Sequence, residues 1–280
     1  MLKKIFDFFV FSSLFIALCA LVMTYQTSFL FNIPFPFALA GFVFCGTVCS
    51  YNFHWYLTPP DLEKPTEKLA WNISNKTIHL LLFIMALAGA GVFSILLINH
   101  WFWLGLTAFI TFLYSAPKIP YPLFSRLKKV AIGKTIFLAM AWMHVTALLP
   151  LVIILKTLEV QHVWYIINRF FFIYSICILF DFRDVAEDKK AGIKSMITYL
   201  TEKGIDKLFW SSLMIFFISS FIMLRFFSLI TIIALLIPGI ILAMLYYPSK
   251  KNFSDYLYYF VLDGLMMLSA PLLLLINLSC

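Results

Sequence analysis

Three aspartates follow an apolar run near the middle of the second half of the chain. Asp181 comes directly after residues 176–180, and Asp184 and Asp188 follow three and seven residues later. Each residue of a helix advances about 100° around the axis, so the three carboxylates share one face, within about 60°, if one helix continues through Asp188. Carboxylates held this close repel one another unless a cation lies between them, and Mg²⁺ binds such oxygens while leaving positions for phosphate oxygens. The spacing predicts a metal site, and the alternative is a solvated loop whose acids align by chance.

The elements that must position these carboxylates are apolar. Hydrophobic residues make up 63% of the 280 residues, and charged residues make up 12%. Because a transmembrane helix needs about 20 mostly apolar residues, we expect an all-α polytopic membrane protein, residues 1–280 as a single domain. The expected transmembrane helices, about nine in number, cover residues 5–25, 35–56, 77–98, 101–116, 131–155, 163–182, 208–224, 228–247 and 256–278.

The distribution of charge predicts the orientation. With the N-terminus in the cytoplasm, all of the 21 lysines and arginines except Lys156, Arg169 and Arg225 belong to cytoplasmic segments, as the positive-inside rule requires. The formal net charge of +8 therefore indicates topology, and no pattern in the chain indicates a nucleic-acid partner. We expect an integral, multi-pass protein of a bacterial inner (plasma) membrane.

Two motifs on the cytoplasmic side have a specific resemblance. Asp181, Asp184 and Asp188 are followed by the basic residue Lys189 and by Gly-Ile-Lys-Ser at 192–195. A second stretch reads Tyr-Ser-Ala-Pro-Lys at 114–118 and precedes basic residues at 128 and 129. Both stretches, together with the number of spans and the larger cytoplasmic segments 57–76, 117–130 and 183–207, resemble the UbiA superfamily of intramembrane prenyltransferases.

This resemblance implies a bundle around a central cavity with a cytoplasmic cap. It also implies transfer of a polyprenyl group from a diphosphate donor to a small aromatic or lipid acceptor within the membrane, with Mg²⁺ as the cofactor. By the same resemblance, the catalytic and metal-binding residues are Asp181, Asp184 and Asp188. The residues that match the diphosphate-binding positions are Asn52, Tyr114, Lys118, Lys128 and Lys189.

One motif of that superfamily is incomplete in this chain. Its first aspartate-rich motif reads roughly N-D-x-x-D-x-x-x-D, and here Asn52 is present while Phe53 and Tyr56 replace the first two acids. Asp61 is the nearest carboxylate and lies beyond Pro59 and Pro60, which end a helix.

Three hypotheses therefore remain open. In the first, a single ion at Asp181, Asp184 and Asp188 suffices for prenyl transfer. In the second, the substrate differs and is, for example, a monophosphate. In the third, the fold persists without catalysis, in a protein that binds a lipid or quinone or acts as a scaffold. A transporter of another class is a further alternative.

Several ionisable residues outside these motifs need an explanation. Arg169, His144 and Asp263 fall inside predicted spans, where such groups usually face an interior or a cavity. Arg169 lies about 18 Å along a helix from Asp181, too far to reach the aspartates. His54 is a candidate ligand or base, and equally a hydrogen-bonded anchor at the interface. The alternating charges at 63, 64, 67 and 68 indicate a solvated helix face in the cap.

Overall fold

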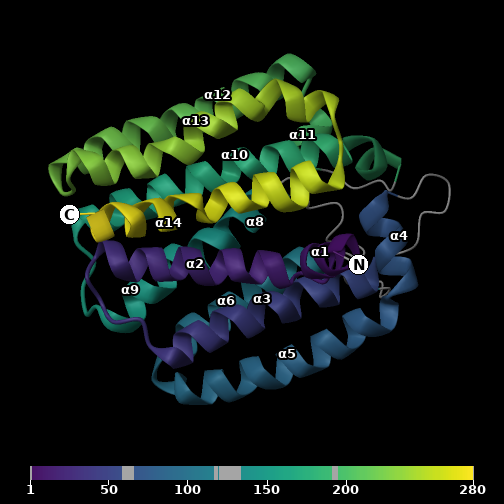
Figure 1. Cartoon of the computed structure of the whole chain (residues 1–280), viewed down its shortest axis with the longest axis horizontal. Coiled ribbons are helices and arrows are strands. Elements are labelled where there is room, and N and C mark those ends of the chain that lie inside the picture. The colour runs from purple at the N-terminus through teal and green to yellow at the C-terminus, as the bar shows by residue number, and fades with distance from the viewer. Residues whose placement is uncertain (1, 59–65, 117–118, 120–133, 191–194, 280) are drawn as a thin grey trace.

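The computed structural model describes residues 2–58, 66–116, 119, 134–190 and 195–279. Helices joined by short connections make up this described part of the chain, and most of them run side by side along the long axis of the molecule (Figure 1). The elements are α1 (Leu2–Phe11), α2 (Leu14–Leu30), α3 (Phe37–Leu57), α4 (Glu67–Ser74), α5 (Lys76–Leu96), η1 (Ile98–His100), α6 (Trp101–Ser115), α8 (Lys134–Met143), η4 (His144–Leu148), α9 (Leu149–Ile154), α10 (Val160–Lys190), α11 (Met196–Tyr199), α12 (Glu202–Ile222), η5 (Met223–Arg225), α13 (Leu229–Lys251), η6 (Leu257–Leu262) and α14 (Asp263–Ser279).

The fold is that of an all-helical, polytopic membrane protein, as the composition predicted. Within the described residues, seven helical segments are long and apolar enough to cross a membrane, and the bent pair α1–α2 brings the number to eight. The remaining predicted span, 101–116, corresponds to α6, which has 15 residues. A helix of that length rises about 22 Å, less than the hydrocarbon thickness of about 30 Å. Two spans contain a π-helical turn, η4 before α9 and η6 before α14.

The first predicted span differs from the structure at its beginning. Residues 5–25 were expected to form one helix, but the chain bends by 61° between α1 and α2. Ser13 at this bend has φ 70°, a left-handed conformation that interrupts a helix. α1 therefore lies across the end of the bundle, where Phe11 contacts Trp71 of α4 and stacks on Tyr256. Of the two helices, only α2 runs alongside the other long helices of the bundle.

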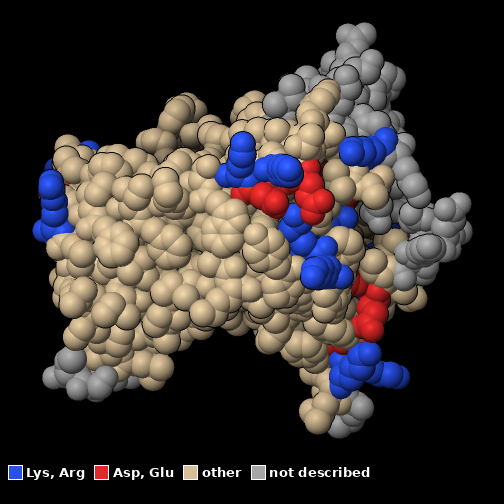
Figure 2. Space-filling model, turned by 90° about the horizontal axis from the view of Figure 1, so that it is seen from above, with Lys and Arg blue, Asp and Glu red and all other residues tan. Residues whose placement is uncertain are grey.

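Charged side chains concentrate at one end of the bundle. The end of α3, the start of α5, the ends of α6 and α10, the start of α12 and the end of α13 meet there beside α1 and α4 (Figure 1). Figure 2 shows most of the visible lysine, arginine, aspartate and glutamate gathered at this end, a broad uncharged surface beside it, and a smaller group of basic side chains at the opposite edge. We call it the charged end and the other one the opposite end. The predicted sidedness of the charge is thus a feature of the folded molecule.

α10 is the most enclosed span, and α5 is the most peripheral. Of the residues in the apolar, membrane-crossing stretch of each helix, 61% are buried inside the protein in α10 and 11% in α5. α10 packs on α12 and on α8, while α3 packs closely on α5. The helix that carries the three aspartates is therefore the span that packs most extensively against the rest of the protein.

A close approach of α12 and α13 depends on a glycine. A Cβ atom at Gly239 would lie 2.2 Å from Cε1 of Phe216, whose side chain is fully buried and packs 5.0 Å from the ring of Phe172. We expect Gly239→Ala to lower the free energy of unfolding by about 1–3 kcal/mol, because overpacking outweighs the helix propensity of alanine. Thermal unfolding in detergent measures this.

The matched control is Gly105→Ala in α6, where a Cβ would have no heavy atom within 4 Å. It should leave the melting temperature unchanged or slightly higher. An equal loss in both variants would contradict the steric explanation.

Candidate functional site

A cavity of about 650 Å³ lies between α3, α5, α6 and α8. Its wall is mostly apolar, and several of the hydroxyl groups along it are used by their own helices. Thr47 donates to the carbonyl of Val43, Ser94 to that of Ala90, and Thr107 to that of Trp103. These residues therefore present carbon to the cavity. Aromatic rings complete the wall: Phe42, Phe53, Phe83, Phe112 and Trp142.

The cavity has a different character towards the charged end. His54 of α3 and Tyr114 of α6 line it there, and their rings stack at 4.8 Å with an interplanar angle of 17°. His54 Nδ1 lies 3.5 Å from the hydroxyl of Ser115, and Trp142 Nε1 donates to the hydroxyl of Tyr51 at 3.0 Å. This end of the cavity can therefore accept a polar group, whereas the remainder suits hydrocarbon.

The three aspartates lie on one continuous helix, as they must if their carboxylates are to share one face. α10 continues to Lys190 and so includes Asp188. Asp181 is 4% exposed and accepts a hydrogen bond from the hydroxyl of Thr135 in α8. Asp184 accepts from Arg183 Nε at 2.9 Å, and Asp188 is buried. Asp181 and Asp184 are thus held by the side chains of Thr135 and Arg183.

This arrangement does not by itself provide a binding site for an ion. Within the described part of the chain, no three His, Cys, Asp or Glu side chains are close enough together to hold a metal ion. The described residues that line the cavity come from α2, α3, α5, α6, α8 and η4, and none comes from α10. The roles of Asp181, Asp184 and Asp188 in metal binding and catalysis stay predictions.

Asn52, the remaining match to the first motif, is completely buried between helices. Its amide nitrogen donates to the carbonyls of Ser12, 3.1 Å away, and Val48, 2.8 Å away. Its oxygen lies 2.7 Å from His79 Nδ1, and the other ring nitrogen of His79 lies 2.9 Å from the side-chain oxygen of Asn72. Asn52 thus connects α3 with the bend after α1 and with α5, and its predicted contact with a diphosphate stays a prediction.

The other predicted diphosphate-binding residues fall into three groups. Tyr114 lines the cavity. Lys189 is exposed near the end of α10. Lys118 and Lys128 lie outside the described residues, so their predicted contacts stay predictions as well.

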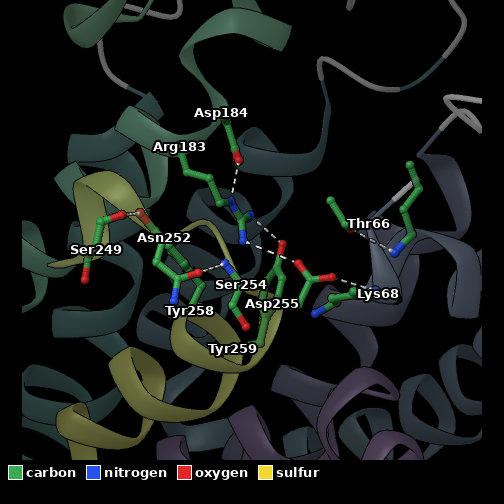
Figure 3. Close-up of polar contacts among 11 residues, drawn as sticks. Thr66, Lys68, Arg183, Asp184, Ser249, Asn252, Ser254, Asp255, Tyr258 and Tyr259 are labelled. Carbon is green, nitrogen blue, oxygen red and sulfur yellow. Dashed lines mark hydrogen bonds and ion pairs between the residues drawn. The ribbon is translucent and has the colours of Figure 1, made fainter. Parts of the chain in front are cut away.

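A buried charge network at the charged end was not predicted. Arg183 reaches from α10 towards the start of the last span (Figure 3), where its Nη2 donates to the hydroxyl of Tyr259 at 2.6 Å and its Nη1 lies 3.8 Å from an oxygen of Asp255. The other oxygen of Asp255 accepts from the backbone N–H of Lys68 at 2.7 Å. One carboxylate thus connects α10 with the cap helix α4.

Lys68 itself corrects one interpretation of the sequence. The alternating charges around it indicated a solvated face, but Lys68 is 4% exposed. Its Nζ lies 3.5 Å from the ring centroid of Tyr259 and 4.4 Å from that of Trp55, an arrangement in which aromatic faces attract a cation. The interpretation holds for the neighbouring Glu67, which is exposed.

The sequence contained little that could have revealed this network. Asp255 and Tyr259 are four residues apart, but Lys68 and Arg183 come from distant segments, so no local spacing relates these to the pair. The one available signal was that Arg183 and Asp255 border apolar segments, where charged groups are costly without partners.

We expect Arg183→Met to loosen α4 from the bundle. The variant leaves Asp255, whose side chain is 3% exposed, without its cationic neighbour, and removing one partner of a buried pair costs about 3–5 kcal/mol. The free energy of unfolding and hydrogen–deuterium exchange across Glu67–Ser74 measure the effect. Adding Asp255→Asn should restore part of the loss, because a neutral amide oxygen still accepts from Lys68.

Lys3→Gln is the matched control, because Lys3 lies 3.8 Å from Glu67 of the same cap helix and both side chains are largely exposed. Exposed pairs contribute under about 1 kcal/mol. Similar losses in Lys3→Gln and Arg183→Met would show that burial of the network is not what holds α4.

Comparison with known proteins supports the fold. No protein-family model and no curated protein matches this chain. Among solved structures, the chain is similar to the apo structure of a UbiA homolog from Aeropyrum pernix K1, with a TM-score of 0.63 and 13% sequence identity over 94% of this chain and 98% of the other. The likeness extends over nearly the whole of both chains. The sequence resemblance is therefore confirmed at the level of structure: this chain is a polytopic membrane protein with the UbiA-type fold.

Proposed function

We propose that this protein binds an isoprenoid chain in the cavity between α3, α5, α6 and α8 and transfers it from a diphosphate donor to an aromatic or lipid acceptor. The observation that carries this proposal is the cavity itself. Its volume of about 650 Å³ falls within the usual range for small-molecule sites, about 300–1,000 Å³. Hydrocarbon lines most of it, and the stacked pair of His54 and Tyr114 gives one end a polar character.

The chemistry of the transfer fits such a compartment. The allylic C1–O bond of the donor breaks, its electron pair leaves with the diphosphate, and a nucleophilic atom of the acceptor bonds to C1 and loses a proton. The apolar wall excludes water that would otherwise capture the allylic cation. Faces of aromatic rings such as Trp142 and Phe112 stabilise positive charge near them.

The polar head of the donor is assigned to the charged end. Tyr114 lines the cavity on that side, and Lys118, Lys128 and Lys189 are the predicted basic contacts, because basic side chains stabilise charge that develops on a departing diphosphate. The positive-inside rule makes this end cytoplasmic, in a bacterial inner membrane. Mg²⁺ at Asp181, Asp184 and Asp188 is part of the proposal, and it requires these carboxylates to leave the contacts they make here.

A second candidate function is non-catalytic binding of a lipid or quinone. The specific observation in its favour is that Phe53 and Tyr56 replace two acids of the first motif, while Asp181 and Asp184 are in contact with Thr135 and Arg183. In this alternative the cavity holds the same kind of chain, but diphosphate confers no advantage.

Filling the cavity should prevent isoprenoid binding without unfolding the protein. Gly46 lines the cavity, and a Cβ there would meet no heavy atom within 4 Å. We expect farnesyl diphosphate to raise the melting temperature of the wild type, and Gly46→Leu to weaken that binding at least about tenfold, because the leucine side chain occupies the space of the ligand.

Gly105→Leu is the control, since its position is equally open but does not line the cavity. It should bind farnesyl diphosphate as the wild type does. Unchanged binding by Gly46→Leu would show that this cavity is not the isoprenoid site.

Magnesium dependence separates the two candidate functions. For a transferase, Mg²⁺ should strengthen binding of farnesyl diphosphate but not of farnesol, and Asp184→Asn should abolish most of the magnesium effect, because the amide cannot act as an anionic ligand. Glu202→Gln is the control, an exposed carboxylate at the same end of the bundle. Titrations followed by thermal unfolding measure both effects.

Equal affinity for farnesol and farnesyl diphosphate, with no effect of Mg²⁺, would favour the non-catalytic alternative. A magnesium effect that persists in Asp184→Asn would remove that aspartate from the metal site.

A further inference from the structure

A guanidinium group is enclosed at membrane depth, far from the charged end. Arg169 lies nine residues after the start of α10 at Val160, about 14 Å into the span. Its side chain is among the largest fully buried ones in the protein, with 1% of the residue exposed. It therefore does not extend to the interface, which is how arginines near the ends of spans usually reach water.

The hydrogen-bond partners of Arg169 are neutral. Nε and Nη2 donate to the side-chain oxygen of Asn168 at 3.3 and 3.0 Å, and Nη1 donates to the hydroxyl of Ser269 at 3.5 Å. A guanidinium has five N–H groups, so two of them have no partner among the described residues. The rings of Phe172 and Tyr165 lie 5.2 and 5.7 Å from the guanidinium carbon.

A second unpartnered donor lies beside the same hydroxyl. Ser269 donates to the side-chain oxygen of Gln26 in α2 at 2.9 Å. The amide nitrogen of Gln26 is buried and has no hydrogen-bond partner among the described residues. Arg169 and Gln26 thus both contact Ser269, and both have N–H groups without an acceptor among the described residues. The side-chain oxygens of Asn168, Ser269 and Gln26 already accept hydrogen bonds. The cluster lacks an acceptor.

The cluster also lacks a negative charge. Among the described residues no carboxylate forms an ion pair with Arg169. The acid of α14, Asp263, is six residues before Ser269, about 9 Å along the helix, and Asp181 is about 18 Å away on α10. Charged groups inside the membrane normally pair or mark a binding site, because a lone buried charge is strongly destabilising.

We propose that Arg169, Gln26 and Ser269 bind a small inorganic anion, chloride in the first instance. The anion would accept the unused N–H groups of Arg169 and Gln26 and neutralise the guanidinium. A small ion fits better than a lipid headgroup, because all three residues are at most 1% exposed. None of them lines the isoprenoid cavity, so the proposal is independent of the proposed function.

The test begins with the wild-type protein in detergent, with gluconate as the counter-ion. We expect saturable binding of one equivalent of ³⁶Cl⁻, displaced by bromide, and a melting temperature that rises with chloride at constant ionic strength. The variant Gln26→Glu supplies an internal anion of nearly the same shape. It should bind chloride at least about tenfold more weakly, because the new carboxylate occupies the place of the ion, and should be stable without chloride.

Ser212→Ala is the control. Ser212 is an equally buried hydroxyl that bonds Ser175 and the carbonyl of Phe171 instead of Arg169, so it should keep wild-type chloride binding. Absence of saturable ³⁶Cl⁻ binding by the wild type would overturn the proposal, as would equal binding by Gln26→Glu. If phosphatidylglycerol raised the melting temperature of the wild type equally with and without chloride, the result would overturn the chloride proposal in favour of a lipid phosphate.

Discussion

Polar groups at membrane depth must find their partners inside this protein, because hydrocarbon offers none. The helical backbone satisfies its own N–H and C=O groups, and several hydroxyls follow the same rule, as when Thr24 donates to the carbonyl of Ala20. Asn168 shows how the rule also joins helices, since its amide nitrogen donates to the carbonyl of Phe216 and to the hydroxyls of Ser219 and Ser220 across the α10–α12 contact. Polar pairing therefore fixes which helices are neighbours, in addition to apolar packing.

The same constraint explains why the two ends of the bundle differ. At the charged end, carboxylates are available, and Arg183 pairs with Asp184 and Asp255 while Lys68 lies against aromatic rings. Deeper in the membrane, the partners of Arg169 among the described residues are an amide, a hydroxyl and aromatic rings. Two cations of one helix are thus in opposite electrostatic situations: Arg183 has acids beside it, whereas Arg169, the one proposed to bind an anion, has no acid paired with it among the described residues.

The parts of the fold that could be predicted are those that depend on local composition. Long apolar runs identified most of the spans, and the distribution of lysine and arginine identified the charged end. The bend at Ser13 escaped prediction, because a serine pair within an apolar run carries no strong break signal and its conformation depends on α1 packing against Trp71 and Tyr256. Asp255 and Lys68 escaped for a related reason: their contact joins segments 187 positions apart in sequence.

The incomplete first motif shows why the fold and the ion site can diverge in this chain. Helix packing depends on dozens of apolar residues, whereas an ion site depends on a few carboxylates. Phe53 stands where the resemblance places an acid, and it stacks on Phe83 of α5 at 5.2 Å and lines the cavity. Tyr56, at the second such position, lies under the ammonium of Lys76 at 5.0 Å. Two positions that would hold charge for a metal ion therefore extend the apolar wall and anchor α5 instead. A ligand in this cavity therefore meets more hydrocarbon and less charge along α3 than the complete motif would provide.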